Sequence, residues 1–220
     1  SGASIAATVF HEGVNTVQVK QTDKAGNVSS PGSLTFTIDT VANAPSLTLA
    51  SDTGSSNIDK ITNNGVVNVT GLEDGATWQY SVDGGAWTNG SGASIAATVF
   101  HEGVNTVQVK QTDKAGNVSS PGSLTFTIDT VANAPSLTLA SDTGSSNIDK
   151  ITNNGVVNVT GLEDGATWQY SVDGGAWTNG SGASIAATVF HEGVNTVQVK
   201  QTDKAGNVSS PGSLTFTIDT

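Results

Sequence analysis

The sequence has no cysteine, no methionine and no arginine in its 220 residues. Without cysteine no disulfide can cross-link the fold, and this absence does not by itself place the protein inside or outside a cell. Glycine, in contrast, occurs at 26 positions, together with many Thr, Ser, Val and Asn residues. Because these residue types favour short strands and tight turns over helices, the composition predicts an all-β protein.

Basic residues are scarce as well. Eight lysines stand against 19 carboxylates, and the formal net charge is −11. Phosphate backbones and anionic lipid surfaces repel such a chain, so we expect no nucleic-acid partner. No apolar run approaches the length of a bilayer-spanning helix, so we expect no direct membrane insertion. Cations are the natural partners of this charge.

The chain is built from perfect repeats. Residues 41–130 and 131–220 are identical, and residues 1–40 repeat the last 40 of each copy. Each full copy can bury one modest core, so we expect a string of small domains that contact identical neighbours in the same chain. Residues 1–40 supply only the last three strands of a domain, which a longer chain or a neighbouring molecule would complete. There is no initiating methionine or signal peptide, so we expect a segment of a longer protein.

Alternating apolar and polar residues predict seven short strands in residues 41–130. In the clearest of them Trp78, Tyr80 and Val82 share one face. The predicted strands are 46–50, 66–70, 77–82, a short strand reaching Trp87, 94–100, 105–111 and 124–128. This number of strands in about 90 residues, with a core tryptophan in the third, is typical of an immunoglobulin-like sandwich. The predicted fold is therefore a tandem series of immunoglobulin-like β-sandwich domains of about seven antiparallel strands.

The carboxylates of this predicted fold gather where one domain follows the next, near residue 130. Those expected at this junction are Asp52, Asp59, Asp83, Glu102 and Asp129 from the first full copy, and Glu163, Asp164 and Asp203 from the second. Like charges in close contact repel, and a bound cation would neutralise them. Ca²⁺ suits such a site because it takes six to eight oxygen ligands in a flexible geometry.

The strongest candidate site combines Asp129 with Asp203 and Asn207. The same spacing relates Asp39 to Asp113 and Asn117. Carboxylates, amides and loop carbonyls are the hard oxygen ligands that Ca²⁺ prefers. The alternative is that Asp113 and Asn117 only cap a turn through side-chain to backbone hydrogen bonds. The residue types alone leave both interpretations open.

Two weaker candidates accompany this site. The loop from Asp52 to Asp59 has two carboxylates that can wrap an ion, or it is a solvated polar loop. Glu73 and Asp74 are adjacent, so both can bind one ion only in a turn. Of this pair we expect Asp74, with its copy Asp164, to be the ligand.

No catalytic constellation is evident, so we do not expect an enzyme. His101 is the only histidine of its repeat, and it lies in a predicted turn without a nucleophile and base pair. Trp78 is expected in the core, whereas Trp87 can be core or surface. An exposed Trp87, or the outward Thr125 and Thr127, would instead favour a glycan- or ice-binding module.

Four motifs carry a resemblance to a known family. They are Asp52-Thr-Gly with Asp59-Lys-Ile-Thr-Asn63, Tyr80-Ser-Val-Asp-Gly-Gly-Ala-Trp87, Gln111-Thr-Asp-Lys-Ala-Gly-Asn117 and Phe126-Thr-Ile-Asp-Thr130. The sequence resembles the bacterial immunoglobulin-like repeats of giant type I-secreted biofilm-associated and RTX adhesins.

The resemblance implies an extracellular stalk on a bacterial cell surface, stiffened by Ca²⁺ between neighbouring domains, with the adhesive target bound elsewhere in the full protein. The family's linker aspartate matches Asp39 and Asp129, and its loop aspartate matches Asp23, Asp113 and Asp203. The linker Val-Ala-Asn-Ala-Pro differs from the Thr-Ala-Pro form of many relatives.

Overall fold

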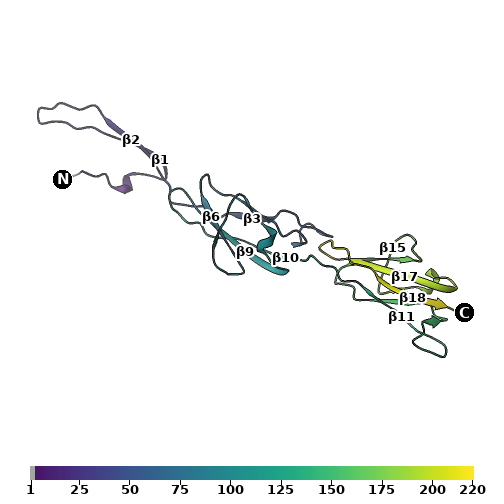
Figure 1. Ribbon diagram of the computed structural model, residues 1–220. Coiled ribbons are helices and arrows are strands. Elements are labelled where there is room, and N and C mark those ends of the chain that lie inside the picture. Colours follow the sequence, from purple (N-terminus) through teal and green to yellow (C-terminus); the bar gives the residue numbers. More distant parts are fainter. Residues whose placement is uncertain (1–2) are drawn as a thin grey trace. The chain divides into compact units, whose positions relative to one another are not determined.

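A computed structural model describes residues 3–220, and the chain is all-β apart from three short 3-10 helices, as predicted (Figure 1). These helices are η1 (Ala7–Val9), η2 (Ala97–Val99) and η3 (Ala187–Val189). The contacts between residues divide the chain into two compact units. The first contains Ser1–Leu47, Val69–Ala93 and Gln108–Ser123, and the second contains Thr48–Asn68, Ser94–Val107 and Leu124–Thr220. Among the described residues, no helix has the length and apolar character of a membrane span.

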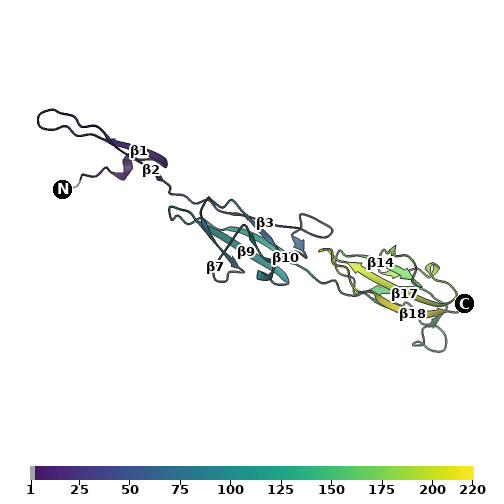
Figure 2. The same cartoon turned by 45° about the horizontal axis from the view of Figure 1, so that its top comes forward.

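The last repeat lies wholly in the second unit and forms a sandwich of two sheets. One sheet has the order β11 (Ser136–Leu139), β13 (Val157–Thr160), β16 (Ser184–Ile185). The other has the order β12 (Ile151–Thr152), β18 (Gly212–Ile218), β17 (Gly193–Thr202), β14 (Thr167–Val172), β15 (Thr178–Asn179). Figure 2 shows β14, β17 and β18 of the larger sheet. All pairs are antiparallel except β12 with β18, which is parallel.

Side chains alternate between buried and less buried along the strands, and the buried ones form the core of this repeat between the two sheets. Along β17 every second side chain is buried, and Val197 and Val199 are fully covered. They pack with Phe216 from β18 and Trp168 from β14. The Trp168 indole N–H donates to the carbonyl of Gly182 at 3.1 Å, so its one polar atom is satisfied. The core position predicted for Trp78 is confirmed, because that side chain is 6% exposed.

The preceding repeat has the same strand order. Its sheets are β3-β5-β8 and β4-β10-β9-β6-β7. The strands are β3 (Ser46–Leu49), β4 (Ile61–Thr62), β5 (Val67–Thr70), β6 (Thr77–Val82), β7 (Thr88–Asn89), β8 (Ser94–Ile95), β9 (Gly103–Thr112) and β10 (Gly122–Ile128). Among residues 3–40 the strands are β1 (Gly13–Val19) and β2 (Gly32–Ile38), which pair antiparallel with each other.

Three local predictions were wrong. The strand predicted over 94–100 ends at Ile95, because Phe100 N–H bonds back to Ala97 O in a 3-10 turn. In residues 3–40 the corresponding strand is absent, and η1 covers Ala7–Val9. The strand predicted to reach Trp87 begins only at Thr88. A further strand, β4, was not predicted at all.

Candidate metal centre

Three carboxylates converge in each unit. In the second unit, Asp129, Glu163 and Asp203 offer one oxygen each, and these atoms all lie within 4.8 Å of one another. In the first unit Asp39, Glu73 and Asp113 do the same. We call each set a junction cluster. These are the only groups of three or more potential metal-ligating side chains among residues 3–220.

Strand ends position the second junction cluster. Asp129 follows β10, and its N–H donates to Thr62 O of the parallel strand β4 at 3.0 Å. Glu163 lies in the turn between β13 and β14, where its N–H donates to Gln201 Oε1 at 2.8 Å. Its carboxylate Oε1 accepts from the backbone N–H of Asn133 at 2.8 Å. The side chain therefore points back to the linker that follows Asp129.

Asp203 lies in the turn after β17, and Asn207 fixes its side chain. The N–H of Asn207 donates to Asp203 Oδ1 at 2.8 Å, and its Nδ2 donates to Asp203 Oδ2 at 2.7 Å. The same Nδ2 also donates to the carbonyl of Asp129 at 2.8 Å. Asn117 makes the same bonds to Asp113 and Asp39. Through its amide nitrogen this asparagine caps the turn and joins two strand ends.

Charge repulsion is concentrated at Asp129. Burial raises the pKa of its carboxyl, and the charges of Asp203, Glu102 and Glu163 raise it further. By contrast, the hydrogen bond from the Asn117 amide lowers the pKa of Asp113. In the sequence-equivalent turn of residues 3–40, Asn27 lowers the pKa of Asp23 in the same way.

The spacing of the oxygens in each junction cluster is compatible with a single Ca²⁺. Two oxygens bound to one Ca²⁺ at about 2.3–2.6 Å can be at most about 5 Å apart, and the cluster oxygens meet this limit. Asp129 uses only Oδ1, in a 3.3 Å bond from Val131 N–H, and Glu163 uses only Oε1. Within residues 3–220 the second oxygen of each has no hydrogen bond, so both remain available as ligands.

The other predicted residues lie apart from this donor set. Glu102 binds Thr130, through Oε1 to its N–H at 3.0 Å and through Oε2 to its hydroxyl at 2.9 Å. Asp164 pairs with Lys204 at 2.7 Å and is 98% exposed, and Asp74 pairs with Lys114 in the same way. Of each adjacent pair it is the glutamate, Glu73 or Glu163, that joins the cluster. The reason is the turn: Glu163 N–H is bound to Gln201, and this fixes which side chain points inward.

Asp52 and Asp59 accept backbone hydrogen bonds in their own loop. Asp52 Oδ2 accepts from Lys60 N–H at 3.0 Å, and Asp59 Oδ1 accepts from Ile61 N–H at 3.0 Å. Asp52 Oδ1 is buried without a hydrogen-bond partner among the described residues. The loop thus positions β4, and its two carboxylates do not enter a junction cluster.

A polar contact that sequence reasoning missed covers the Asp203 turn. Thr53 Oγ1 donates to Ala205 O at 2.7 Å, and Ser55 N–H donates to Lys204 O at 3.2 Å. Ala205 is consequently fully buried. In the sequence only Gly54 could have pointed to this contact, because its backbone lies so close to Lys204 and Ala205 that no side chain fits there.

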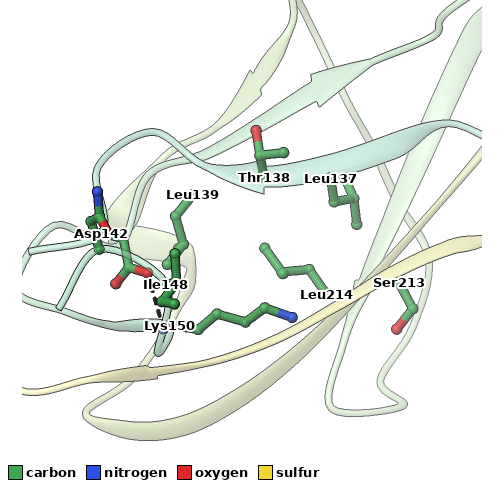
Figure 3. Close-up of a pocket in the computed structure, with 9 residues that line it drawn as sticks. Leu137, Thr138, Leu139, Asp142, Ile148, Lys150, Ser213 and Leu214 are labelled. Carbon is green, nitrogen blue, oxygen red and sulfur yellow. Dashed lines mark hydrogen bonds between the residues drawn. The ribbon is translucent and has the colours of Figure 1, made fainter.

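A shallow groove of about 430 Å³ lies between β11 and β18 (Figure 3). Leu137, Leu139 and Leu214 form its aliphatic walls, and the Lys150 side chain extends along it. Asp142 reaches its rim and accepts from Lys150 N–H at 3.0 Å. The groove gathers a single carboxylate, so it offers no second metal centre.

Comparison with known protein families finds a match to each full repeat. A family model described as bacterial Ig-like domain matches residues 41–130 and 131–220. No curated protein sequence matches the chain. Among solved structures, fibronectin(III)-like modules of Clostridium thermocellum CbhA are 13% identical, with 79% of this chain and 94% of that chain covered and a TM-score of 0.37.

Two further solved structures come from a biofilm associated protein and from a large adhesion protein. The BSP domain of a biofilm associated protein is 21% identical, with 73% of this chain and 28% of that chain covered and a TM-score of 0.31. The tetra-tandem repeat from the extending region of a large adhesion protein is 15% identical, with 95% of this chain and 58% of that chain covered and a TM-score of 0.33. The chain thus spans less than two thirds of either structure.

Proposed function

The chain belongs to the bacterial Ig-like domain family through both of its full repeats, and from this membership we propose that it is an extender segment of a bacterial surface adhesin. In this role the repeats hold an adhesive region, located elsewhere in the full protein, away from the cell. Ca²⁺ at each junction cluster stiffens the connection between successive repeats. The observation that carries the proposal is the convergence of Asp129, Glu163 and Asp203 at the end of β10.

Electrostatics explain why such a junction would respond to a cation. At the 4.8 Å limit of the cluster, two carboxylates repel by about 1 kcal/mol in bulk water and by about 3.5 kcal/mol at an effective dielectric constant of about 20. Three pairs add together, so the ion-free junction is pushed open. A bound Ca²⁺ supplies two positive charges and reverses the sign of this interaction.

In this proposal some residues bind the ion and others hold the ligands in position. Asp129, Glu163 and Asp203 would hold the ion. Asn207 keeps Asp203 beside the carbonyl of Asp129, and Asn133 holds Glu163 against the linker. Extracellular Ca²⁺ in the millimolar range populates sites with dissociation constants of about 10⁻⁴ to 10⁻³ M. Such a site is filled outside a cell and empty at cytosolic Ca²⁺ levels.

Small-angle X-ray scattering of the whole chain, with Ca²⁺ and with a chelator, tests the proposal. We expect Ca²⁺ to increase the maximum dimension of the particle and to narrow the range of conformations that the scattering reports. The double variant Glu73→Gln with Glu163→Gln should lose this response. The matched control is Asp74→Asn with Asp164→Asn, which removes the same charge from the adjacent residues and should keep it. An identical scattering profile with Ca²⁺ and with chelator would refute the stiffening role.

A further inference from the structure

Each full repeat contains three Asn-X-Ser/Thr triplets. They begin at Asn68, Asn89 and Asn117, with copies at Asn158, Asn179 and Asn207. This triplet is the acceptor pattern for N-linked glycosylation, which requires an exposed asparagine amide. The pattern alone is common, so the structure must decide which of the three is usable.

Two of the triplets are already engaged in the fold. Asn68 lies within β5, paired with Ser94 of β8, and is half-buried. The Nδ2 of Asn117 donates to Asp39 O and to Asp113 Oδ2, and Ser119 of the same triplet is buried. A sugar on either amide would break these contacts.

The triplet at Asn179 is exposed and keeps its amide nitrogen free of hydrogen bonds to residues 3–220. Asn179 and Ser181 are exposed, and Asn179 ends β15, the edge strand of the five-stranded sheet. Its Oδ1 accepts from Gln169 Nε2 at 2.9 Å, which orients the amide, and its Nδ2 has no hydrogen bond to residues 3–220. The copy at Asn89 has the same geometry, with Gln79 as the donor. The nucleophilic nitrogen is therefore held in place and unengaged.

An exposed tryptophan precedes this asparagine by two residues. Trp177 is 37% exposed, and Lys200 Nζ lies 4.3 Å from its ring centroid. Lys200 is paired in register with Gln169, the residue that orients Asn179. Trp177 and Asn179 thus each contact one member of the same cross-strand pair, Lys200 and Gln169 respectively. A flat indole at this place can stack on the C–H face of a sugar attached to Asn179.

We propose that Asn89 and Asn179 are acceptor sites for N-linked glycosylation, with Trp87 and Trp177 as the stacking surface for the first sugar. The donor is a sugar joined through a diphosphate to a nucleotide or lipid carrier. A bond forms between Nδ2 and the sugar C1, the bond between C1 and the diphosphate oxygen breaks, and the amide proton leaves with the diphosphate. The attached sugar would cover the short edge strands β7 and β15 and hinder pairing with the edge of another copy.

Peptide mapping of the protein recovered from the surface of the cells that naturally produce it tests the proposal. We expect a hexose or N-acetylhexosamine mass on Asn89 and its copy, located by electron-transfer fragmentation, and intact mass should count two glycans in these 220 residues. Asn68 and Asn117 serve as internal controls in the same chain and should be unmodified. Unmodified Asn89, or sugar on Asn68 or Asn117 instead, would overturn the assignment.

Variants separate attachment from stacking. Asn89→Gln with Asn179→Gln, and independently Ser91→Ala with Ser181→Ala, should each abolish the added mass while leaving the far-UV circular dichroism unchanged. Trp87→Ala with Trp177→Ala should retain the sugar. Enzymatic removal of the glycan should lower the melting temperature of the parent chain but not of this tryptophan variant. An equal shift in both would exclude the stacking role.

Discussion

Gly54 and Gly144 occupy the same position in the two identical repeats but have different surroundings. Both have a left-handed backbone, with φ of +92° and +94°. A Cβ added to Gly54 would overlap the backbone of Lys204 and Ala205, whereas among the described residues a Cβ on Gly144 meets nothing within 4 Å. The pair of variants Gly54→Ala and Gly144→Ala therefore isolates the contact at the Asp203 turn from the local cost of the substitution.

The expected magnitudes follow from these surroundings. Both variants lose about 1–2 kcal/mol, because alanine is strained in the left-handed region. Gly54→Ala must also displace its loop and break the bonds of Thr53 to Ala205 O (2.7 Å) and of Ser55 to Lys204 O (3.2 Å). At about 0.5–1.5 kcal/mol for each hydrogen bond, it should be about 1–3 kcal/mol less stable than Gly144→Ala.

Urea denaturation of the full chain, followed by tryptophan fluorescence, measures this difference. The midpoint should fall further for Gly54→Ala than for Gly144→Ala. Equal midpoints for the two variants would show that the contact contributes nothing to stability, and our account of the covered turn would fail.

Three other substitutions probe the core, a surface pair and the second junction cluster. Gly180→Ala should cost about 1–3 kcal/mol, because its Cβ would overlap the Trp168 ring, and near-UV circular dichroism should report the repacking. The pKa of His191 should lie above its usual 6.5, because its ring bonds to Glu192 O and to the Asp173 carboxylate. The stabilisation from this pair is complete below about pH 6.5 and is lost as pH rises through the raised pKa. Asp129→Asn should raise the urea midpoint in chelator, because it removes repulsion, and should abolish the rise that Ca²⁺ causes in the parent chain.

Each of these three has a defined contrary result. Unchanged stability of Gly180→Ala would mean that the ring can move away without cost. By NMR titration the pKa of His191 should fall in Asp173→Asn, while the bond to Glu192 O still holds it above its usual value, and an unaltered titration would dismiss the pair. If Asp129→Asn were destabilised in chelator, its carboxylate would be a net favourable group and the repulsion argument would be wrong.

The sequence predicted those strands whose alternation reflects burial. Trp78, Tyr80 and Val82 gave the bounds of β6 correctly, although Ser81 between them is also buried. The same alternation misled at Ile95, Ala97 and Val99, because Ala97–Val99 form a 3-10 turn that brings Phe100 edge-on to Phe126 at 5.0 Å. Strand β4 has only two residues and pairs with distant β10, so no local pattern could reveal it.

Part of the candidate site could also be predicted from the sequence. Asp129 and Asp203 follow predicted strands, and an up-and-down order brings those strand ends together. The choice between Glu163 and Asp164 depends on the bond from Glu163 N–H to the buried Gln201, a residue 38 positions away. The orientation of the Asn207 amide depends likewise on the Asp129 carbonyl. Such choices are set by tertiary contacts, which residue types alone do not encode.

The parallel pairing of β12 with β18 gives the repeat a mechanical property. Once β11 has been released from β13, tension applied through the chain pulls β12 toward its amino end and β18 toward its carboxyl end, along the axes of the two strands. The bonds of Thr217 N–H to Lys150 O and of Asp219 N–H to Thr152 O, at 2.9 and 3.1 Å, are then loaded together in shear and cannot open one by one. Because forced unfolding is governed by the rate of barrier crossing, this parallel pair should slow the unfolding of the repeat under tension.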